Sequence, residues 1–184
     1  MAEGLQPMSV GSAKEKSRLR GRGGKSGGAR KKECVVVGIG NPLMGDDGFG
    51  IEMARSLREL HLGRGVLVLE RQTMDIAVLD YAKRASRLVI VDAVRSGRPP
   101  GSVVRFIVSG HRSLSLRVPL SHEQRLYDLL TLARKSGMRV PPTVVVGVEP
   151  ADCTPGNGLS AEIKRALPRA LEKARDEVEE CAQR

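Results

Sequence analysis

Two aspartates and one histidine stand where an α/β fold would bring them together. Asp47 follows the first predicted strand, Asp92 ends the third, and His122 is the second residue of a predicted helix. The carboxyl ends of parallel strands share one edge of an open sheet, and ligands bind at that edge. Two carboxylates and an imidazole suit a borderline divalent ion such as nickel and leave room for outside ligands. We therefore predict that these three residues form a site that contacts metal and carries catalysis.

Each of the three residues also has a simpler explanation. Asp47 or its neighbour Asp46 could cap the helix that follows. Asp92 could satisfy a turn, and His122 could be an exposed polar residue. The positive end of its helix would keep the His122 imidazole neutral, which is the form that binds metal. The prediction of a site therefore rests on the three residues together.

A glycine-rich loop from Gly38 to Gly50 joins the first predicted strand to the first predicted helix. A strand, a glycine loop and a helix also occur in dinucleotide-binding folds, whose fingerprint is G-x-G-x-x-G. Leu43 stands where the third glycine of that fingerprint would be. Asp46 and Asp47 would also place negative charge where a phosphate should lie. The loop therefore disfavours a nucleotide.

The spacing of apolar residues predicts the elements that position this loop. Continuous apolar runs indicate buried strands, and apolar residues every three or four positions indicate helices. We predict strands over residues 34–39, 66–69, 88–91, 103–108 and 143–148, and helices over residues 46–60, 74–82, 121–136 and 160–181. This alternation predicts a three-layer α/β fold, with a five-stranded, mostly parallel sheet flanked by helices on both faces.

Charge is distributed unevenly along the 184 residues. Residues 1–32 hold nine Lys or Arg against two Glu, so about +7 of the net charge of +10 lies there. This segment lacks apolar periodicity, so we expect a disordered basic tail over residues 1–32 and one α/β domain over residues 33–184. The domain carries only +3, which does not favour nucleic acid as a partner.

Composition also bears on the compartment. No run approaches the roughly 20 apolar residues of a membrane helix, and no apolar segment of a secretory signal follows the first basic residues. Cys34, Cys153 and Cys181 are an odd number without C-x-x-C spacing, which argues against a disulfide framework and a thiolate zinc site. We expect a cytoplasmic monomer that does not contact a membrane.

The segment from Gly38 to Gly50 resembles the signature of the hydrogenase maturation proteases, Gly-x-Gly-Asn-x-Leu-x-x-Asp-Asp/Glu-Gly-x-Gly. Other stretches agree with that family in order and spacing. They are Asp92-Ala93 followed by Pro100-Gly101, Ser121-His122 at a helix start, and Gly147 to Pro150 at the end of the last strand. The resemblance covers roughly residues 34–180, and an ordered set of motifs is more specific than any one of them.

The resemblance implies an endopeptidase that removes the C-terminal extension of a nickel-loaded [NiFe]-hydrogenase large-subunit precursor. Asp47, Asp92 and His122 fall on the positions with which the family contacts metal. The precursor would carry the nickel, and the free enzyme need not bind it. Asp47, Asp92 or a metal-bound water would then activate the attacking water, and the sequence does not decide among them.

Two alternatives remain open from the sequence. The first is a binding module that recognises nickel-loaded precursors without cutting them. The second is a nucleic-acid-related hydrolase, because Gly38 to Pro42 also resembles the first strand end of peptidyl-tRNA hydrolase. That second match stops at Pro42.

One stretch departs from the maturation protease pattern. The family commonly shows Gly-Gly-Thr/Ser after the second strand, whereas residues 71–75 read Arg-Gln-Thr-Met-Asp here. This loop opens on the edge of the predicted site, so the departure bears on the choice of substrate. Cys153 lies in the loop after the fifth strand, and we do not assign it to the site.

Overall fold

The computed structural model describes residues 33–108, 121–156 and 158–183, without the side chains of residues 33, 121–125, 182 and 183. The predicted basic tail therefore lies outside the described residues. None of the helices in the described ranges is long and apolar enough to cross a membrane.

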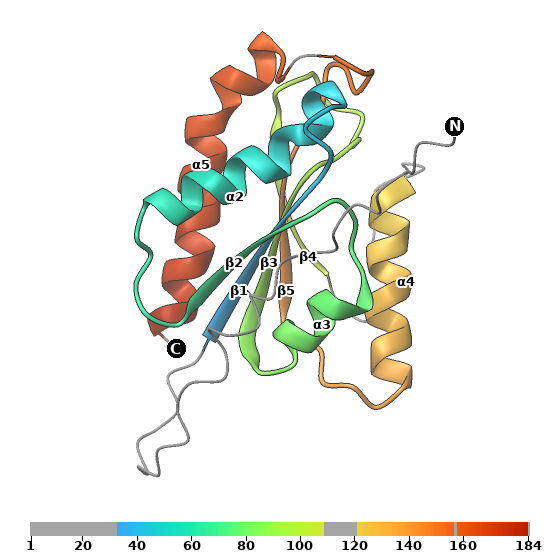
Figure 1. The fold of residues 1–184 in the computed structure, drawn as a ribbon, viewed down its shortest axis with the longest axis vertical. Coiled ribbons are helices and arrows are strands. Elements are labelled where there is room, and N and C mark those ends of the chain that lie inside the picture. Colours follow the sequence, from blue (N-terminus) through green and yellow to red (C-terminus); the bar gives the residue numbers. More distant parts are fainter. Residues whose placement is uncertain (1–32, 109–120, 157, 184) are drawn as a thin grey trace, which may run out of the picture. The chain divides into compact units, whose positions relative to one another are not determined.

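A five-stranded sheet forms the centre of the domain (Figure 1). Its strands are β1 (Glu33–Ile39), β2 (Val66–Arg71), β3 (Ala85–Ala93), β4 (Val103–Val108) and β5 (Thr143–Val148). Their order in the sheet is β2-β1-β3-β5-β4. All neighbouring strands are parallel except β4, which runs antiparallel to β5. The predicted five-stranded, mostly parallel sheet is confirmed.

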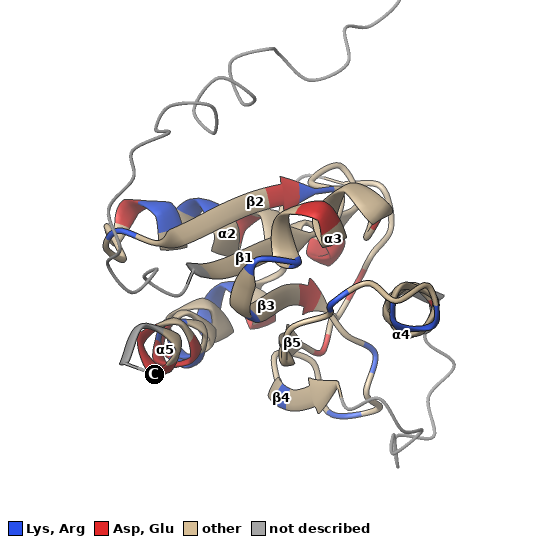
Figure 2. Cartoon of the chain, turned by 90° about the horizontal axis from the view of Figure 1, so that it is seen from below, with Lys and Arg blue, Asp and Glu red and all other residues tan. Residues whose placement is uncertain are grey.

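Helices cover both faces of this sheet, as predicted. They are the 3-10 helix η1 (Gly45–Gly48) and the α-helices α2 (Phe49–Glu59), α3 (Ile76–Ala82), α4 (Ser121–Lys135) and α5 (Ala161–Gln183). Figure 2 shows α2 and α5 on one face and α3 and α4 on the other. Side chains alternate between the faces along each strand, so the apolar core has two halves. Val35 and Val37 pack in the half under α3 and α4, whereas Cys34 and Val36 pack in the half under α2 and α5.

The strands bring three residues into a row at the carboxyl edge of the sheet. Ile39 of β1 pairs with Arg71 of β2. Gly38 pairs with Val91 of β3, so the next residue, Asp92, comes beside Ile39. We call Arg71, Ile39 and Asp92 the edge row.

All three members of the edge row point to the face that α3 and α4 cover. Ile39 is buried in that half of the core, as are Leu69 and Ile90. Arg71 and Asp92 stand two positions after Leu69 and Ile90, and residues two apart in a strand point to the same face. The edge row therefore lies on the side of the sheet where α4 packs.

Several element boundaries differ from the prediction by one to three residues, and the predicted helix over residues 46–60 is divided into η1 and α2. Two of these differences have identifiable reasons. Helix α3 begins at Ile76 rather than residue 74, because Asp75 has an extended backbone and accepts hydrogen bonds from the N–H groups of Ala77 (2.9 Å) and Val78 (3.2 Å). Strand β3 begins at Ala85 rather than residue 88. Its first residues include Ser86 and Arg87, which are polar and contact Cys181 and Glu177 of α5. The spacing of apolar residues cannot show such distant contacts.

Candidate active site at the carboxyl edge of the sheet

The loop of residues 40–48, which we call the signature loop, folds back against itself after β1. Gly40 has a backbone φ of +142°, and a Cβ at this position would lie 1.8 Å from the carbonyl oxygen of Asp47. Only glycine permits such an approach without strain. The loop can therefore hold Asp47 beside the end of β1.

Asp47 is half-buried in the signature loop. Its Oδ2 atom accepts a hydrogen bond of 2.7 Å from the backbone N–H of Asn41. This bond orients the carboxylate while part of the side chain remains open to solvent. A ligand arriving from outside can therefore reach Asp47.

Asp46 has a different environment, although it is the next residue in the chain. It is fully buried, and its carboxylate accepts hydrogen bonds from the N–H groups of Ala151 (2.8 Å) and Asp152 (3.0 Å). The N–H (2.7 Å) and hydroxyl (3.0 Å) of Ser160 also donate to it. We call these four residues the Asp46 clamp. The clamp ties the signature loop to the segment that leads into α5.

The Asp46 clamp keeps its carboxylate charged. Burial by itself raises the pKa of Asp46, but hydrogen bonds from Ser160, Asp152 and Ala151 outweigh burial and lower the pKa below its ordinary value. No side-chain hydrogen bond caps η1 or α2. The alternative that Asp46 or Asp47 caps the following helix is therefore wrong, and Asp46 instead braces a distant loop.

Asp92 lies in β3 and is only 4% exposed. As a member of the edge row it points to the face that α4 covers. Helix α4 runs against the direction of β3, so its first turn, which contains His122, lies toward the carboxyl edge (Figure 1). The side chain of His122 lies outside the described residues, and its contact with Asp47 or Asp92 remains a prediction. Among the described side chains, no group of three or more His, Cys, Asp or Glu could hold a metal ion.

Cys153 and Arg95 lie in the loops that follow β5 and β3, and neither was assigned to the site from the sequence. Burial raises the pKa of the Cys153 thiol, and the carboxylates of Asp47 and Asp46 raise it further, whereas the charge and hydrogen bond of Arg95 act to lower it. Cys153 is therefore within electrostatic range of Asp47 and in contact with Arg95. Its position just after β5, on the shared edge, was the only signal of this in the sequence.

A second buried carboxylate braces the loop that follows β3. Glu149 is 8% exposed, and its Oε2 accepts hydrogen bonds from the N–H (2.6 Å) and hydroxyl (2.7 Å) of Ser96 and from the N–H of Arg98 (3.2 Å). The chain on both sides of Asp92 is thereby fixed, by β3 before it and by Glu149 after it.

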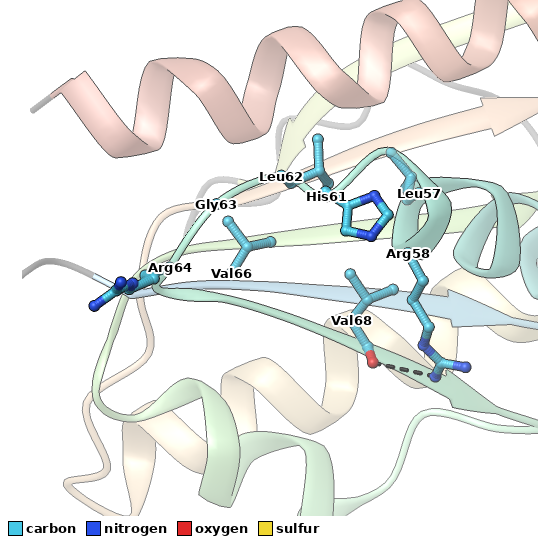
Figure 3. A pocket seen from close by; sticks show the side chains of 8 residues that line it. All are labelled: Leu57, Arg58, His61, Leu62, Gly63, Arg64, Val66 and Val68. Atoms are coloured by element: carbon cyan, nitrogen blue, oxygen red, sulfur yellow. Dashed lines mark hydrogen bonds between the residues drawn. The ribbon is translucent and has the colours of Figure 1, made fainter.

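A hollow of about 380 Å³ lies at the start of β2, on the opposite edge of the sheet (Figure 3). Its lining residues are Leu57, Arg58, His61, Leu62, Gly63, Arg64, Val66 and Val68. The lining includes one histidine but no carboxylate, so it offers no acid–base or metal-binding pair. We assign it no chemistry.

Comparison with known proteins identifies the family. The model of the hydrogenase maturation protease family matches residues 51–177, which is more than half of the chain. The chain belongs to the hydrogenase maturation protease family. Asp92 and His122 lie within the matched residues, and Asp47 lies just before them.

Individual relatives agree with this membership of the hydrogenase maturation protease family. The hydrogenase expression/formation protein HupD of Thiocapsa roseopersicina is 32% identical over 152 residues, which cover 77% of this chain and 66% of HupD. The chain thus spans just under two thirds of that relative. The [NiFe] hydrogenase maturation protease HybD of Thermococcus kodakarensis superimposes with a TM-score of 0.65 at 26% identity, over 79% of this chain and 99% of HybD.

The hydrogenase maturating endopeptidase HybD of E. coli shares the fold, with a TM-score of 0.69 at 24% identity over 80% of this chain and 93% of that protein. The family consists of proteases, so the chain belongs to a family of hydrolases. These findings favour neither the non-cleaving module nor the peptidyl-tRNA-hydrolase-like alternative.

Proposed function

We propose that this chain is an endopeptidase that removes the C-terminal extension from the nickel-loaded large-subunit precursor of a [NiFe]-hydrogenase. One observation of the structure carries the proposal. Within the signature loop, Asp46 is buried in its clamp, whereas Asp47 is oriented by Asn41 and remains open to a ligand. Family membership supplies the reaction class, and the names of the relatives supply the hydrogenase context.

In this proposal the nickel belongs to the substrate and not to the protease. Asp47, Asp92 and His122 would contact the nickel that the precursor already holds. Such an oxygen, oxygen, nitrogen set suits a borderline divalent ion. The contact would place the nearby scissile peptide against the carboxyl edge of the sheet, and correct placement alone can accelerate a reaction by many orders of magnitude.

The hydrolytic step requires a base for the attacking water. Asp47 and Asp92 are the candidates among the described residues, because each is a carboxylate at the carboxyl edge of the sheet. A carboxylate that accepts the proton of water in the transition state contributes about 10²–10⁴-fold to the rate. The leaving amine then takes up a proton, and the shortened large subunit dissociates. We place this reaction in the cytoplasm, with the protease acting as a monomer.

The test compares precursor with and without nickel. Purified protein is mixed with each form, and removal of the extension is followed by mass spectrometry of the large subunit. We expect cleavage of the nickel-loaded precursor only, and nickel added to the protease alone should not rescue the metal-free precursor. Equal cleavage of both forms would overturn the role of nickel, and binding of the loaded precursor without cleavage would favour the non-cleaving module.

A further inference from the structure

Arg71 is the last residue of β2 and the member of the edge row farthest from Asp92. Its carbonyl oxygen accepts a hydrogen bond of 3.0 Å from the N–H of Gly40, the first residue of the signature loop. The backbone at Arg71 is therefore fixed relative to the loop that carries Asp47. Arg71 also opens the stretch of residues 71–75, where the chain departs from the family pattern.

The guanidinium group of Arg71 is held in place by two contacts. Its Cζ atom lies 5.9 Å from the centre of the Tyr81 ring, and its Nη1 atom donates a hydrogen bond of 2.8 Å to the carbonyl oxygen of Glu70. A cation above an aromatic face is stabilised electrostatically, and a planar guanidinium fixed in this way loses little entropy when it binds a ligand. Arg71 is half-buried, so solvent screens it less than a surface arginine.

Other arginines of the sheet and of α2 are already paired with carboxylates. Arg58 pairs with Glu70, and Arg87 and Arg105 pair with Glu177. No carboxylate among the described side chains pairs with Arg71. A guanidinium with donors left over binds a carboxylate through short, charge-assisted hydrogen bonds.

The sheet geometry sets the distance from Arg71 to the predicted metal-contacting residues. Neighbouring strands lie about 4.8 Å apart, so the backbones at Arg71 and Asp92, two strands apart, are separated by roughly 10 Å. An extended peptide advances about 3.3 Å per residue and crosses that distance in about three residues. A substrate peptide anchored at Asp92 can therefore reach Arg71.

We propose that Arg71 binds a carboxylate of the precursor about three residues from the cleavage position and thereby selects which precursor is cut. This inference rests on the proposed function. The carboxylate comes from an acidic side chain or from the end of the C-terminal extension, and the experiment distinguishes the two sources.

The experiment measures kcat and KM for cleavage of the nickel-loaded precursor by the full-length protein. We expect Arg71→Gln to raise KM about 10-fold and to leave kcat within about 3-fold, because the contact exists before and during the reaction. The KM of Arg71→Lys should lie between those of the unaltered protein and Arg71→Gln, because lysine keeps the charge but lacks the planar guanidinium group. Arg169→Gln, an exposed arginine on the helix of the opposite face, is the matched control and should not change KM.

Substrate variants identify the carboxylate. Each Asp or Glu within about four residues of the cleavage position is changed to Asn or Gln, and in a separate precursor two added glycines move the terminal carboxylate. With the unaltered protease, kcat/KM for one of these precursors should be about 10-fold lower than for the original precursor. With Arg71→Gln, kcat/KM should be the same for both precursors. A double-mutant cycle gives this result when the two altered groups are in direct contact.

Each other outcome overturns a specific statement. An unchanged KM for Arg71→Gln, a fall in kcat alone, or losses that add independently would refute the role of Arg71 and leave the proposed function standing. A protease that cuts no precursor at all would instead refute the proposed function. Melting temperatures of the Arg71 variants within about 2 °C of the unaltered protein would show that the changes in KM do not come from a loss of stability.

Discussion

Asp46 and Asp47 are chemically identical neighbours that differ in burial and in the number of hydrogen bonds that they accept. Asp46 is fully buried and accepts hydrogen bonds from Ala151, Asp152 and Ser160, whereas Asp47 is half-buried and is oriented by Asn41. Donors from the protein itself occupy the first carboxylate. The second carboxylate keeps oxygen lone pairs that a ligand can use.

This difference shows how one short loop can combine rigidity with reactivity. A buried charge is costly unless hydrogen bonds satisfy it. The Asp46 clamp meets that need and at the same time fixes the backbone on which Asp47 stands. The position of Asp47 therefore depends on a residue that has no part in the proposed chemistry.

The largest expected effect comes from Asp47→Asn. Asparagine keeps an oxygen that can accept from Asn41 but removes the negative charge, so cleavage of nickel-loaded precursor should fall about 10³-fold. The melting temperature should stay within about 2 °C of the unaltered protein, because no buried contact is lost. Asp176→Asn, an exposed aspartate on α5, is the control for charge loss. Activity retained within a few-fold would remove Asp47 from the site.

Asp46→Asn should act on stability instead. An amide would turn an N–H₂ group toward the donors of the clamp and leave some of them unsatisfied, so the free energy of unfolding should fall by about 3 kcal/mol. For a protein of this length, that corresponds to a melting temperature lower by roughly 6–12 °C. Urea unfolding followed by circular dichroism measures the difference. A variant as stable as the unaltered protein would show that the clamp does not hold the loop.

The smallest expected effect is a pH dependence of the stability difference between the unaltered protein and Asp46→Asn. The pKa of Asp46 is lower in the folded state than its ordinary value of 3.8, so its contribution to stability is present above that pH and disappears as the pH falls through the folded pKa. The stability gap between the unaltered protein and Asp46→Asn should therefore be constant at neutral pH and narrow below about pH 4. Unfolding curves at several pH values test this, and a gap that widens in acid would contradict it.

Much of the fold could be predicted because it depends on local apolar patterns. The runs over residues 103–108 and 143–148 match β4 and β5 to the residue. The start of β3 could not be predicted, since Ser86 and Arg87 are polar and have their partners on α5. Ser86 contacts Cys181 and Arg87 pairs with Glu177, about 90 residues later in the chain.

The candidate site also has a part that the sequence predicts and a part that it does not. The rule that parallel strands share a carboxyl edge was enough to place Asp47 and Asp92 on one side of the sheet. It could not separate Asp46 from Asp47, because the donors that occupy Asp46 lie 105 to 114 residues away. The same rule could not show that Arg71 stacks on Tyr81, because that contact depends on how α3 packs against the sheet.

The Asp46 clamp also determines when the site can form during synthesis of the chain. Ser160 caps α5 through its hydroxyl, which accepts from the N–H of Ile163 (3.3 Å), and it closes the clamp from 114 residues away. Contacts between such distant residues form late, because closing a long loop costs entropy before the contact stabilises it. While α5 is still in the ribosome, Ser160 cannot donate to Asp46, so the clamp is incomplete and the signature loop lacks its brace. We therefore expect a nascent chain to be inactive, and the protease to become active only when its last helix has folded.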